Sequence, residues 1–197
     1  MSLRRRPAVL ASALAALLAA PSSPARADAE VEALAIATGV IVLASLITDM
    51  PEREEPDAVA LEVGRFDAVK KVQPATAFSG EFRVGRLLWW DLRPFVGAGV
   101  TSRQSLYGYG GIRLATYWGE RIVLTPSFAV GGYSRGEGKD LGNPAVVGRF
   151  GIDLEYRFDN AMRLGVAYHH FSNGKAFGQS VNPGTEVIGL TFLLPLR

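Results

Sequence analysis

The chain has 197 residues and no cysteine, with 21 basic and 19 acidic side chains and a formal net charge of +2. Without cysteine, a disulfide framework and thiolate chemistry are both excluded. The first 27 residues hold four arginines and no acid, so the remainder has 17 basic against 19 acidic side chains, a net charge of 17 − 19 = −2. Binding to nucleic acid would need a basic patch. Nucleic acid is therefore not expected as a partner.

Residues 1–27 have the three parts of a secretory signal peptide. A basic head, Arg4 to Arg6, precedes an apolar run from Ala8 to Ala20, and Ala25-Arg26-Ala27 forms a small-residue cleavage site. We expect cleavage before Asp28, and hence an exported protein. The alternative, a buried N-terminal helix of a cytosolic protein, would need the same three features to coincide by chance.

Residues 28–57 form an N-terminal segment whose structure the sequence leaves open. Ala33 to Ile47 is apolar but short for a membrane-spanning helix, and the acidic stretch Pro51 to Pro56 follows it. The segment fits a periplasmic helix, an interfacial helix or part of a long leader. No uninterrupted run of 18 apolar residues remains after the leader, so a helical span is not expected.

Residues 58–197 are expected to form one all-β domain, an eight-stranded antiparallel outer-membrane β-barrel. Runs of about ten residues, rich in Val, Phe, Tyr, Leu and Gly, alternate here with turn-forming clusters, as is typical of such barrels. The expected strands are Ala58 to Phe66, Thr76 to Val84, Leu92 to Thr101, Leu106 to Tyr117, Arg121 to Tyr133, Val147 to Phe158, Met162 to Ser172 and Thr185 to Leu194.

Side chains within these runs alternate between apolar and polar. Successive side chains of a strand point to opposite faces. In the sixth run, one face carries Phe150, Ile152, Leu154, Tyr156 and Phe158, and the other Arg149, Gly151, Asp153, Glu155 and Arg157. A membrane barrel would turn the apolar face outward, whereas a soluble lipocalin-like barrel would turn it inward. Aromatic residues at run ends, namely Trp89, Trp90, Tyr117 and Trp118, favour the membrane, where such residues form interfacial girdles.

The connections between runs predict an orientation. Those around Ser134 to Val146 and Asn173 to Gly184 are long, whereas those at the opposite end are short on average. Outer-membrane barrels place short turns in the periplasm and long loops outside. The end of the seventh run should therefore lie at the extracellular rim.

That rim carries three residues of complementary chemistry. His170 and Ser172 are two positions apart and share a face with Leu164, Val166 and Tyr168, while Glu186 shares a face with Ile188 and Leu190. A serine hydroxyl becomes a nucleophile when an imidazole takes its proton, and an acid orients that imidazole. Taken singly, each of the three would be an ordinary interfacial residue. A shared face and rim favour a Ser-His-Glu catalytic site.

His170-Phe171-Ser172-Asn173, the motif Asn182-Pro183-Gly184 with Glu186, and the closing apolar strand resemble the lipid A 3-O-deacylase (PagL) family. The resemblance covers the barrel from about Val59 to the C-terminus. It implies a hydrolase that removes the ester-linked acyl chain at the 3-position of lipid A in the Gram-negative outer membrane. It further implies that Ser172 is the nucleophile, His170 the general base and Glu186 the orienting acid. Asn173, next to the nucleophile, is a candidate oxyanion donor.

Further sequence features argue against a metal site and against an α/β-hydrolase. His169 has the opposite parity to His170 and should face the lumen in a structural role, so the two histidines do not converge on a metal. Residues 132–136 (GYSRG) match G-x-S-x-G, but they lie at the end of an expected strand in an all-β domain and do not lead into a helix, which disfavours the strand-to-helix elbow of an α/β-hydrolase. Neither a cofactor nor a metal is expected. The expected partners are lipopolysaccharide and membrane lipid, with self-association left open. A small structural or adhesin-like barrel and a soluble carrier remain the competing hypotheses.

Overall fold

The computed structural model describes residues 54–88, 91–142, 146–173 and 183–196. The predicted signal peptide, almost all of the 28–57 segment, and Trp89 and Trp90 lie outside these ranges. No helix among the described residues is long and apolar enough to cross a membrane.

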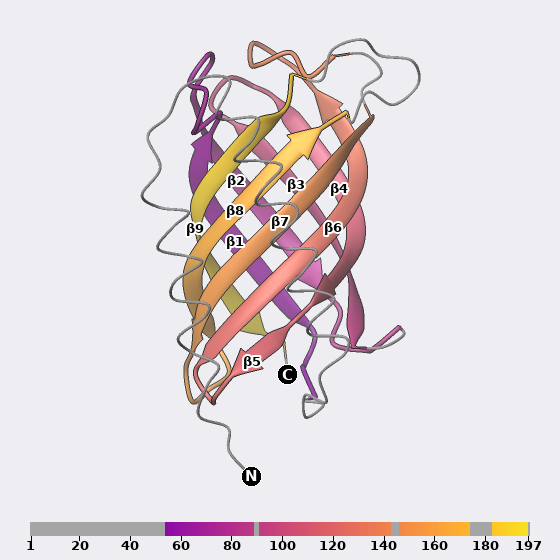
Figure 1. Cartoon of the computed structure of the whole chain (residues 1–197), viewed down its shortest axis with the longest axis vertical. Coiled ribbons are helices and arrows are strands. Elements are labelled where there is room, and N and C mark those ends of the chain that lie inside the picture. Colours follow the sequence, from indigo (N-terminus) through magenta and orange to yellow (C-terminus); the bar gives the residue numbers. More distant parts are fainter. Residues whose placement is uncertain (1–53, 89–90, 143–145, 174–182, 197) are drawn as a thin grey trace.

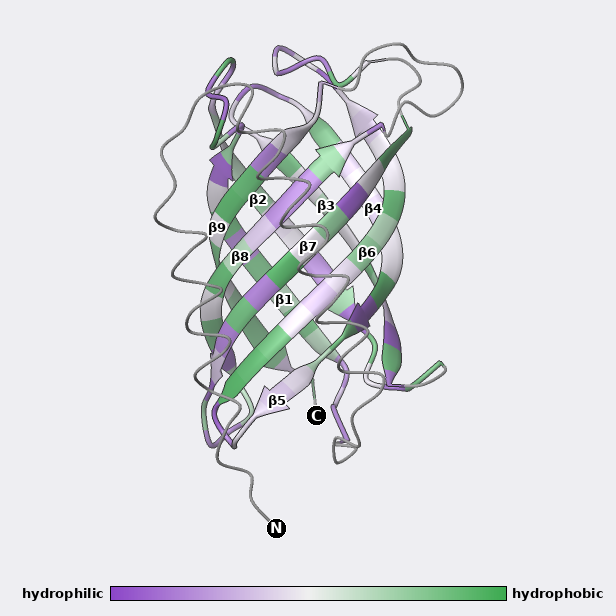
Figure 2. Cartoon of the chain, viewed as in Figure 1, coloured by the Kyte–Doolittle hydropathy of each residue, from purple (hydrophilic) through white to green (hydrophobic). Residues whose placement is uncertain are grey.

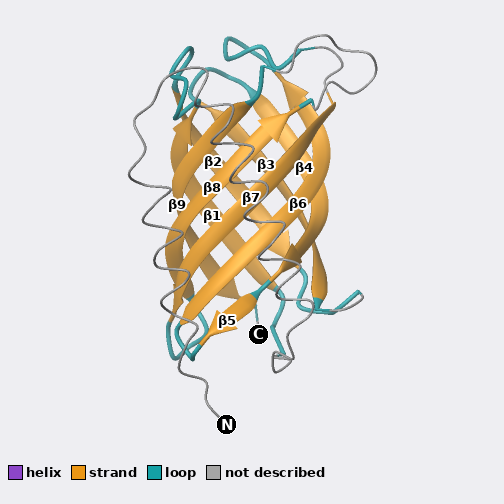
Figure 3. Ribbon diagram, in the orientation of Figure 1, coloured by secondary structure: helices purple, strands orange, loops and turns teal. Residues whose placement is uncertain are grey.

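The described chain is built from β-strands joined by turns and loops (Figures 1 and 3). The elements are β1 (Ala58–Phe66), β2 (Ala75–Arg83), β3 (Leu92–Thr101), β4 (Leu106–Leu114), β5 (Thr116–Trp118), β6 (Ile122–Ser134), β7 (Val146–Arg157), β8 (Arg163–Ser172) and β9 (Thr185–Pro195). They match the expected runs closely.

Antiparallel pairing closes these strands into a barrel. The order β4-β3-β2-β1-β9-β8-β7-β6-β5 is completed by pairing of β4 with β6. Strand β5 continues β4 in the same register, because Arg113 pairs with Ser127 and Thr116 with Leu124. The interruption falls opposite Pro126, which has no N–H to donate to the ladder. Together β4 and β5 form the single expected run, so the barrel has eight strands.

The outer wall is apolar, as the alternation predicted. In β7, Phe150, Ile152 and Leu154 alternate with fully buried Arg149, Asp153 and Glu155. Figure 2 shows the resulting change between hydrophobic and hydrophilic positions along each strand. Large apolar side chains on the wall, such as Phe78 and Leu190, are more than half exposed. A wall of this composition is suited to lipid and unsuited to water, which excludes the soluble-carrier hypothesis.

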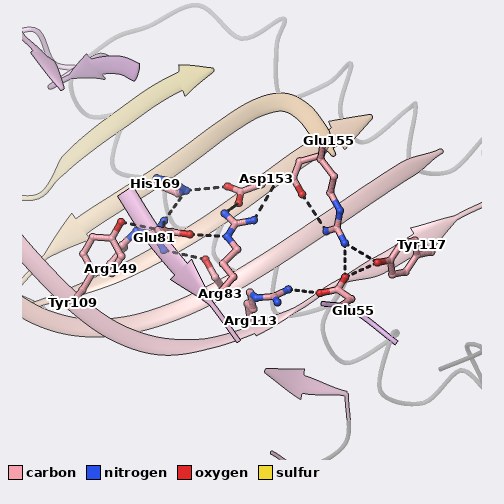
Figure 4. Close-up of polar contacts among 12 residues, drawn as sticks. Glu55, Glu81, Arg83, Tyr109, Arg113, Tyr117, Arg149, Asp153, Glu155 and His169 are labelled. Carbon is pink, nitrogen blue, oxygen red and sulfur yellow. Dashed lines mark hydrogen bonds and ion pairs between the residues drawn. The ribbon is translucent and has the colours of Figure 1, made fainter. Parts of the chain in front are cut away.

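Ion pairs fill the middle of the lumen (Figure 4). Arg83 lies 2.8 Å from Glu81, 2.6 Å from Asp153 and 3.5 Å from Glu155. Arg149 contacts Glu81 at 2.8 Å. Each charge taken from water thus has an opposite charge beside it, the condition under which buried ionic groups are tolerated. This network joins β2 to β7 across the barrel.

A carboxylate from the segment before β1 closes the lower end of the lumen. Glu55 contacts Arg113 at 2.7 Å and Arg163 at 2.6 Å, and accepts a hydrogen bond from the Tyr117 hydroxyl. Burial alone would raise the pKa of Glu55, but the guanidinium groups of Arg163 and Arg113 hold it well below its usual range. The expectation that Tyr117 belongs to an interfacial girdle was wrong, because its hydroxyl is committed to this buried cluster.

Candidate active site

The three candidate catalytic residues lie where β8 ends and β9 begins, which is the upper end of these two strands in Figure 1. His170 and Ser172 occupy the outward parity of β8, together with Leu164 and Val166, which are about half exposed. His170 pairs directly with Glu186 of β9. Directly paired residues of antiparallel strands project to the same face. Glu186, His170 and Ser172 therefore share the outer wall, as their parity predicted.

The imidazole of His170 faces the carboxylate of Glu186. Nδ1 of His170 lies 3.4 Å from Oε1 of Glu186, and the glutamate side chain is fully buried. The burial is unexpected for an acid on the wall, where a solvated rim charge was the ordinary alternative. A buried carboxylate interacts more strongly with a neighbouring imidazolium than a solvated one does. Glu186 is thus suited to orient the ring and to stabilise its protonated form.

Phe171 anchors the strand segment that carries His170 and Ser172. Its side chain points into the lumen, is 2% exposed, and packs edge-to-face on Tyr107 and Tyr109 at centroid distances of 5.2 and 6.2 Å. Edge-to-face aromatic pairs favour one relative orientation of the rings. The packing inside the barrel therefore fixes the backbone from which the two outward residues project.

Asn173 faces away from the wall that carries Ser172. Its side chain is buried, and Nδ2 donates a hydrogen bond of 3.0 Å to the carbonyl of Leu141 in the loop between β6 and β7. The amide thus ties the end of β8 to that loop. This bond uses one of the two hydrogens on the amide nitrogen.

The same loop is tied to the other side of the hairpin. Lys139 forms a buried ion pair with Asp67 at 2.5 Å, just beyond the end of β1. The next residue, Ala68, donates its backbone N–H to the carbonyl of Glu186 at 3.2 Å. The backbone of Glu186 is therefore held from β8 through His170 and from the β1 side through Ala68.

Two glycines leave space around the candidate site. A Cβ at Gly184 would lie 2.8 Å from Cε1 and 3.2 Å from Nε2 of His170, so the imidazole occupies the volume that a side chain there would need. Across from Ser172, the paired residue of β7 is Gly148. The missing side chain leaves the wall beside the serine uncovered on that strand.

We expect Gly184→Ala to lower the rate of ester hydrolysis by about tenfold or more without unfolding the barrel. The new methyl group displaces the tip of the His170 ring, and a misplacement of about 1 Å in a catalytic group costs about a hundredfold in the least tolerant cases. Initial rates on lipid A, with folding followed by heat-modifiable gel migration, check this. Gly132→Ala is the matched control, because a Cβ there meets nothing within 4 Å. Equal rates for both variants would contradict a role for the position of the His170 ring in hydrolysis.

His169 lies inside the barrel, as its parity predicted. Its Nε2 is 2.9 Å from Asp153, its Nδ1 is 3.1 Å from Glu62, and Arg149 lies 2.8 Å from Nε2. The ring is part of the lumen network and faces away from Ser172. Among the described residues, no group of three His, Cys, Asp or Glu side chains is arranged to hold a metal ion.

The fold and this site define a class of protein: an outer-membrane β-barrel that carries serine, histidine and glutamate on its lipid-facing wall. The family model described as "Lipid A 3-O-deacylase (PagL)" matches residues 95–195, slightly more than half of the chain. The chain therefore belongs to the lipid A 3-O-deacylase family, and it is a lipid A deacylase of the Gram-negative outer membrane. No curated protein matches the sequence.

One solved enzyme structure supports this fold, and two other solved barrels are less similar. A crystal structure of the outer-membrane enzyme PagL is 18% identical, with a TM-score of 0.52, and the match covers 71% of this chain and 99% of that one. A de novo designed transmembrane β-barrel, 14% identical, has a TM-score of 0.47 and covers 74% and 100%. The outer-membrane protein Ail of Yersinia pestis, 12% identical, has a TM-score of 0.41 and covers 71% and 100%.

Parity reasoning missed several residues around the site. Gly184 belongs to the Asn182-Pro183-Gly184 motif, but its contact with the His170 ring depends on how the chain enters β9. The pairing of Asp67 with Lys139 joins residues 72 positions apart, and no local pattern indicates it. Arg65 in β1 also lies near the site, and the alternation of β1 alone would have placed it on the outer wall.

Proposed function

We propose that this protein hydrolyses the ester-linked 3-hydroxyacyl chain at the 3-position of lipid A, using Ser172, His170 and Glu186 as a catalytic triad. The observation that carries the proposal is the 3.4 Å approach of the His170 imidazole to the buried Glu186 carboxylate, on the same lipid-facing wall as Ser172. Membership of the lipid A 3-O-deacylase family supports the substrate and the position of the ester.

In the proposed reaction, Oγ of Ser172 attacks the ester carbonyl while Nε2 of His170 takes the hydroxyl proton. The tetrahedral intermediate collapses, and the protonated imidazole returns the proton to the sugar oxygen that leaves. Water then attacks the acyl-serine with His170 again as base, and the free 3-hydroxy fatty acid departs. Glu186 orients the ring and stabilises the imidazolium throughout.

The outward direction of the triad suits a substrate that is itself a membrane lipid. A lipid A molecule can reach the wall by lateral diffusion and present its ester at the rim without leaving the membrane. The long loops beside the triad support an extracellular position for this end of the barrel, and lipopolysaccharide occupies the outer leaflet. Polar catalytic groups near an interface also cost less than groups at the midplane of the membrane.

Asn173 remains our candidate oxyanion donor. A donor to the developing oxyanion is required because the tetrahedral intermediate carries a negative charge, and removal of one such donor typically costs about 10²–10³ in rate. In the state described here, the Asn173 amide is bonded to Leu141. That bond uses one of the two amide hydrogens, so we assign the contact to the oxyanion to the other amide hydrogen or to the backbone N–H of Asn173.

The test is incubation of the purified, folded protein with defined lipid A in detergent micelles, followed by tandem mass spectrometry of the product. We expect loss of one 3-hydroxyacyl chain, with fragments that locate the loss at the 3-position. Loss from the 2- or 3′-position would refute the proposed regiochemistry. Unchanged lipid A would favour a structural or adhesin-like barrel.

A further inference from the structure

The lipid-facing wall has three basic or acidic side chains on the described strands, and they lie together. They are His170 on β8, Glu186 on β9 and Arg65 on β1, consecutive neighbours in the barrel. The remaining outward positions of β1 to β9 carry apolar, aromatic, glycine or uncharged polar residues. Two of the three belong to the proposed triad, which leaves the third, Arg65, without an assigned role.

Strand register places Arg65 close to the triad. Arg65 pairs with Ile188 of β9, two residues from Glu186, and Ile188 pairs with Tyr168 of β8, two residues from His170. With strands about 5 Å apart and a rise of about 3.3 Å per residue, the Cα atoms of Arg65 and Glu186 are roughly 8 Å apart. A long arginine side chain at this distance can reach a ligand that also contacts the triad.

No ion pair within the described part of the chain accounts for a charged side chain at Arg65. The side chain is exposed, and among the described residues no carboxylate lies within ion-pair distance of it. Its neighbours on the wall are uncharged: Val63 and Ile188 are 45% and 46% exposed, and Thr76 is its pair on β2. A cation on a lipid-facing wall is unfavourable unless it reaches the interface or serves a function. Arg65 is the next-to-last residue of β1, at the same end of the barrel as Ser172.

We propose that Arg65 is a substrate-binding residue that holds a phosphate group of lipid A while its ester lies at Ser172, an inference that rests on the proposed function. Lipid A carries phosphates on its diglucosamine headgroup, within a sugar or two of the ester. A guanidinium binds phosphate through two parallel N–H···O bonds, which gives orientation as well as affinity. The contact positions the headgroup, and selects phosphorylated glycolipids over neutral ones.

The experiment compares wild type, Arg65→Gln and Arg65→Lys on bisphosphoryl lipid A and on its two monophosphoryl forms, lacking the 1- or the 4′-phosphate. The lipids are presented in micelles of an uncharged detergent, so that no other phosphate competes. We expect Arg65→Gln to lower kcat/KM for the bisphosphoryl lipid by about tenfold or more, mainly through KM, because it removes a charge-assisted, two-point contact with phosphate. Arg65→Lys should recover part of this loss, because it keeps the charge without the planar fork.

The decisive result is whether the loss caused by Arg65→Gln depends on which phosphates the lipid carries. For wild type, removal of the phosphate that Arg65 binds should lower kcat/KM about as much as Arg65→Gln lowers it on the bisphosphoryl lipid. On the lipid that lacks this phosphate, Arg65→Gln should cause no further loss of kcat/KM. Lys71→Gln is the matched control: it removes the same charge from an exposed residue of the β1–β2 loop, and should leave kcat/KM unchanged. Equal losses for Arg65→Gln on all three lipids would overturn the phosphate contact. If wild type itself fails to deacylate lipid A, the proposed function fails instead.

Discussion

Ser172→Ala is expected to reduce the rate of lipid A deacylation by at least about a thousandfold, because removal of a triad serine eliminates the covalent route and leaves only binding and oxyanion stabilisation. The barrel should remain folded. Ser172 is the last residue of β8, and Phe171 and the register with β7 hold that strand end through contacts that do not involve the hydroxyl. Initial rates of fatty-acid release from purified lipid A measure the effect.

Ser134→Ala is the matched control for this substitution. Ser134 is an exposed serine at the upper end of β6, so its replacement removes the same hydroxyl from the same rim. We expect it to retain the wild-type rate. Residual activity of Ser172→Ala above about a tenth of wild type would exclude Ser172 as the nucleophile, since no triad leaves that much activity without it.

Arg83→Met is expected to lower the free energy of unfolding by about 3–5 kcal/mol, the usual cost of removing one partner from a buried ionic group. The substitution leaves Glu81, Asp153 and Glu155 facing one another without the guanidinium between them. Methionine fills most of the volume of the arginine side chain but carries no charge to neutralise the three carboxylates. Urea-induced unfolding in detergent, read by heat-modifiable gel migration, measures the shift.

Arg103→Met tests whether loss of any arginine has the same effect. Arg103 is exposed on the β3–β4 turn, and its side chain donates a hydrogen bond to the carbonyl of Pro74. We expect a change within about 0.5 kcal/mol, as for most surface substitutions. A comparable loss for both variants would show that the lumen network contributes no specific stability.

Strand parity explains why so much of the barrel could be predicted from the sequence. A strand repeats every two residues, so one pattern of apolar and polar positions assigns both faces at once. It assigned Arg149 and His169 to the lumen and His170 to the wall. The same pattern could have identified Arg65 as a cation on the wall.

The remaining features depend on how distant strands meet, and alternation contains no such information. Parity assigned Asp153 to the lumen without predicting that Arg83, 70 residues earlier, would lie beside it. Tyr117 was expected at the interface because aromatic residues often lie there, but Glu55 and Arg163 enclose its hydroxyl. The full burial of Glu186 was also not predictable, because the wall position alone suggested a solvated rim charge.

The most direct test of the central claim is chemical labelling of the nucleophile. Folded wild-type protein is treated with an alkyl fluorophosphonate, which reacts with activated serines, and the modified residue is located by peptide mass spectrometry as lipid A deacylation is followed. We predict a single modification at Ser172 that proceeds in step with loss of activity and is absent from His170→Ala. Complete inactivation with the label on another residue, or full activity with Ser172 modified, would contradict a Ser172–His170–Glu186 triad.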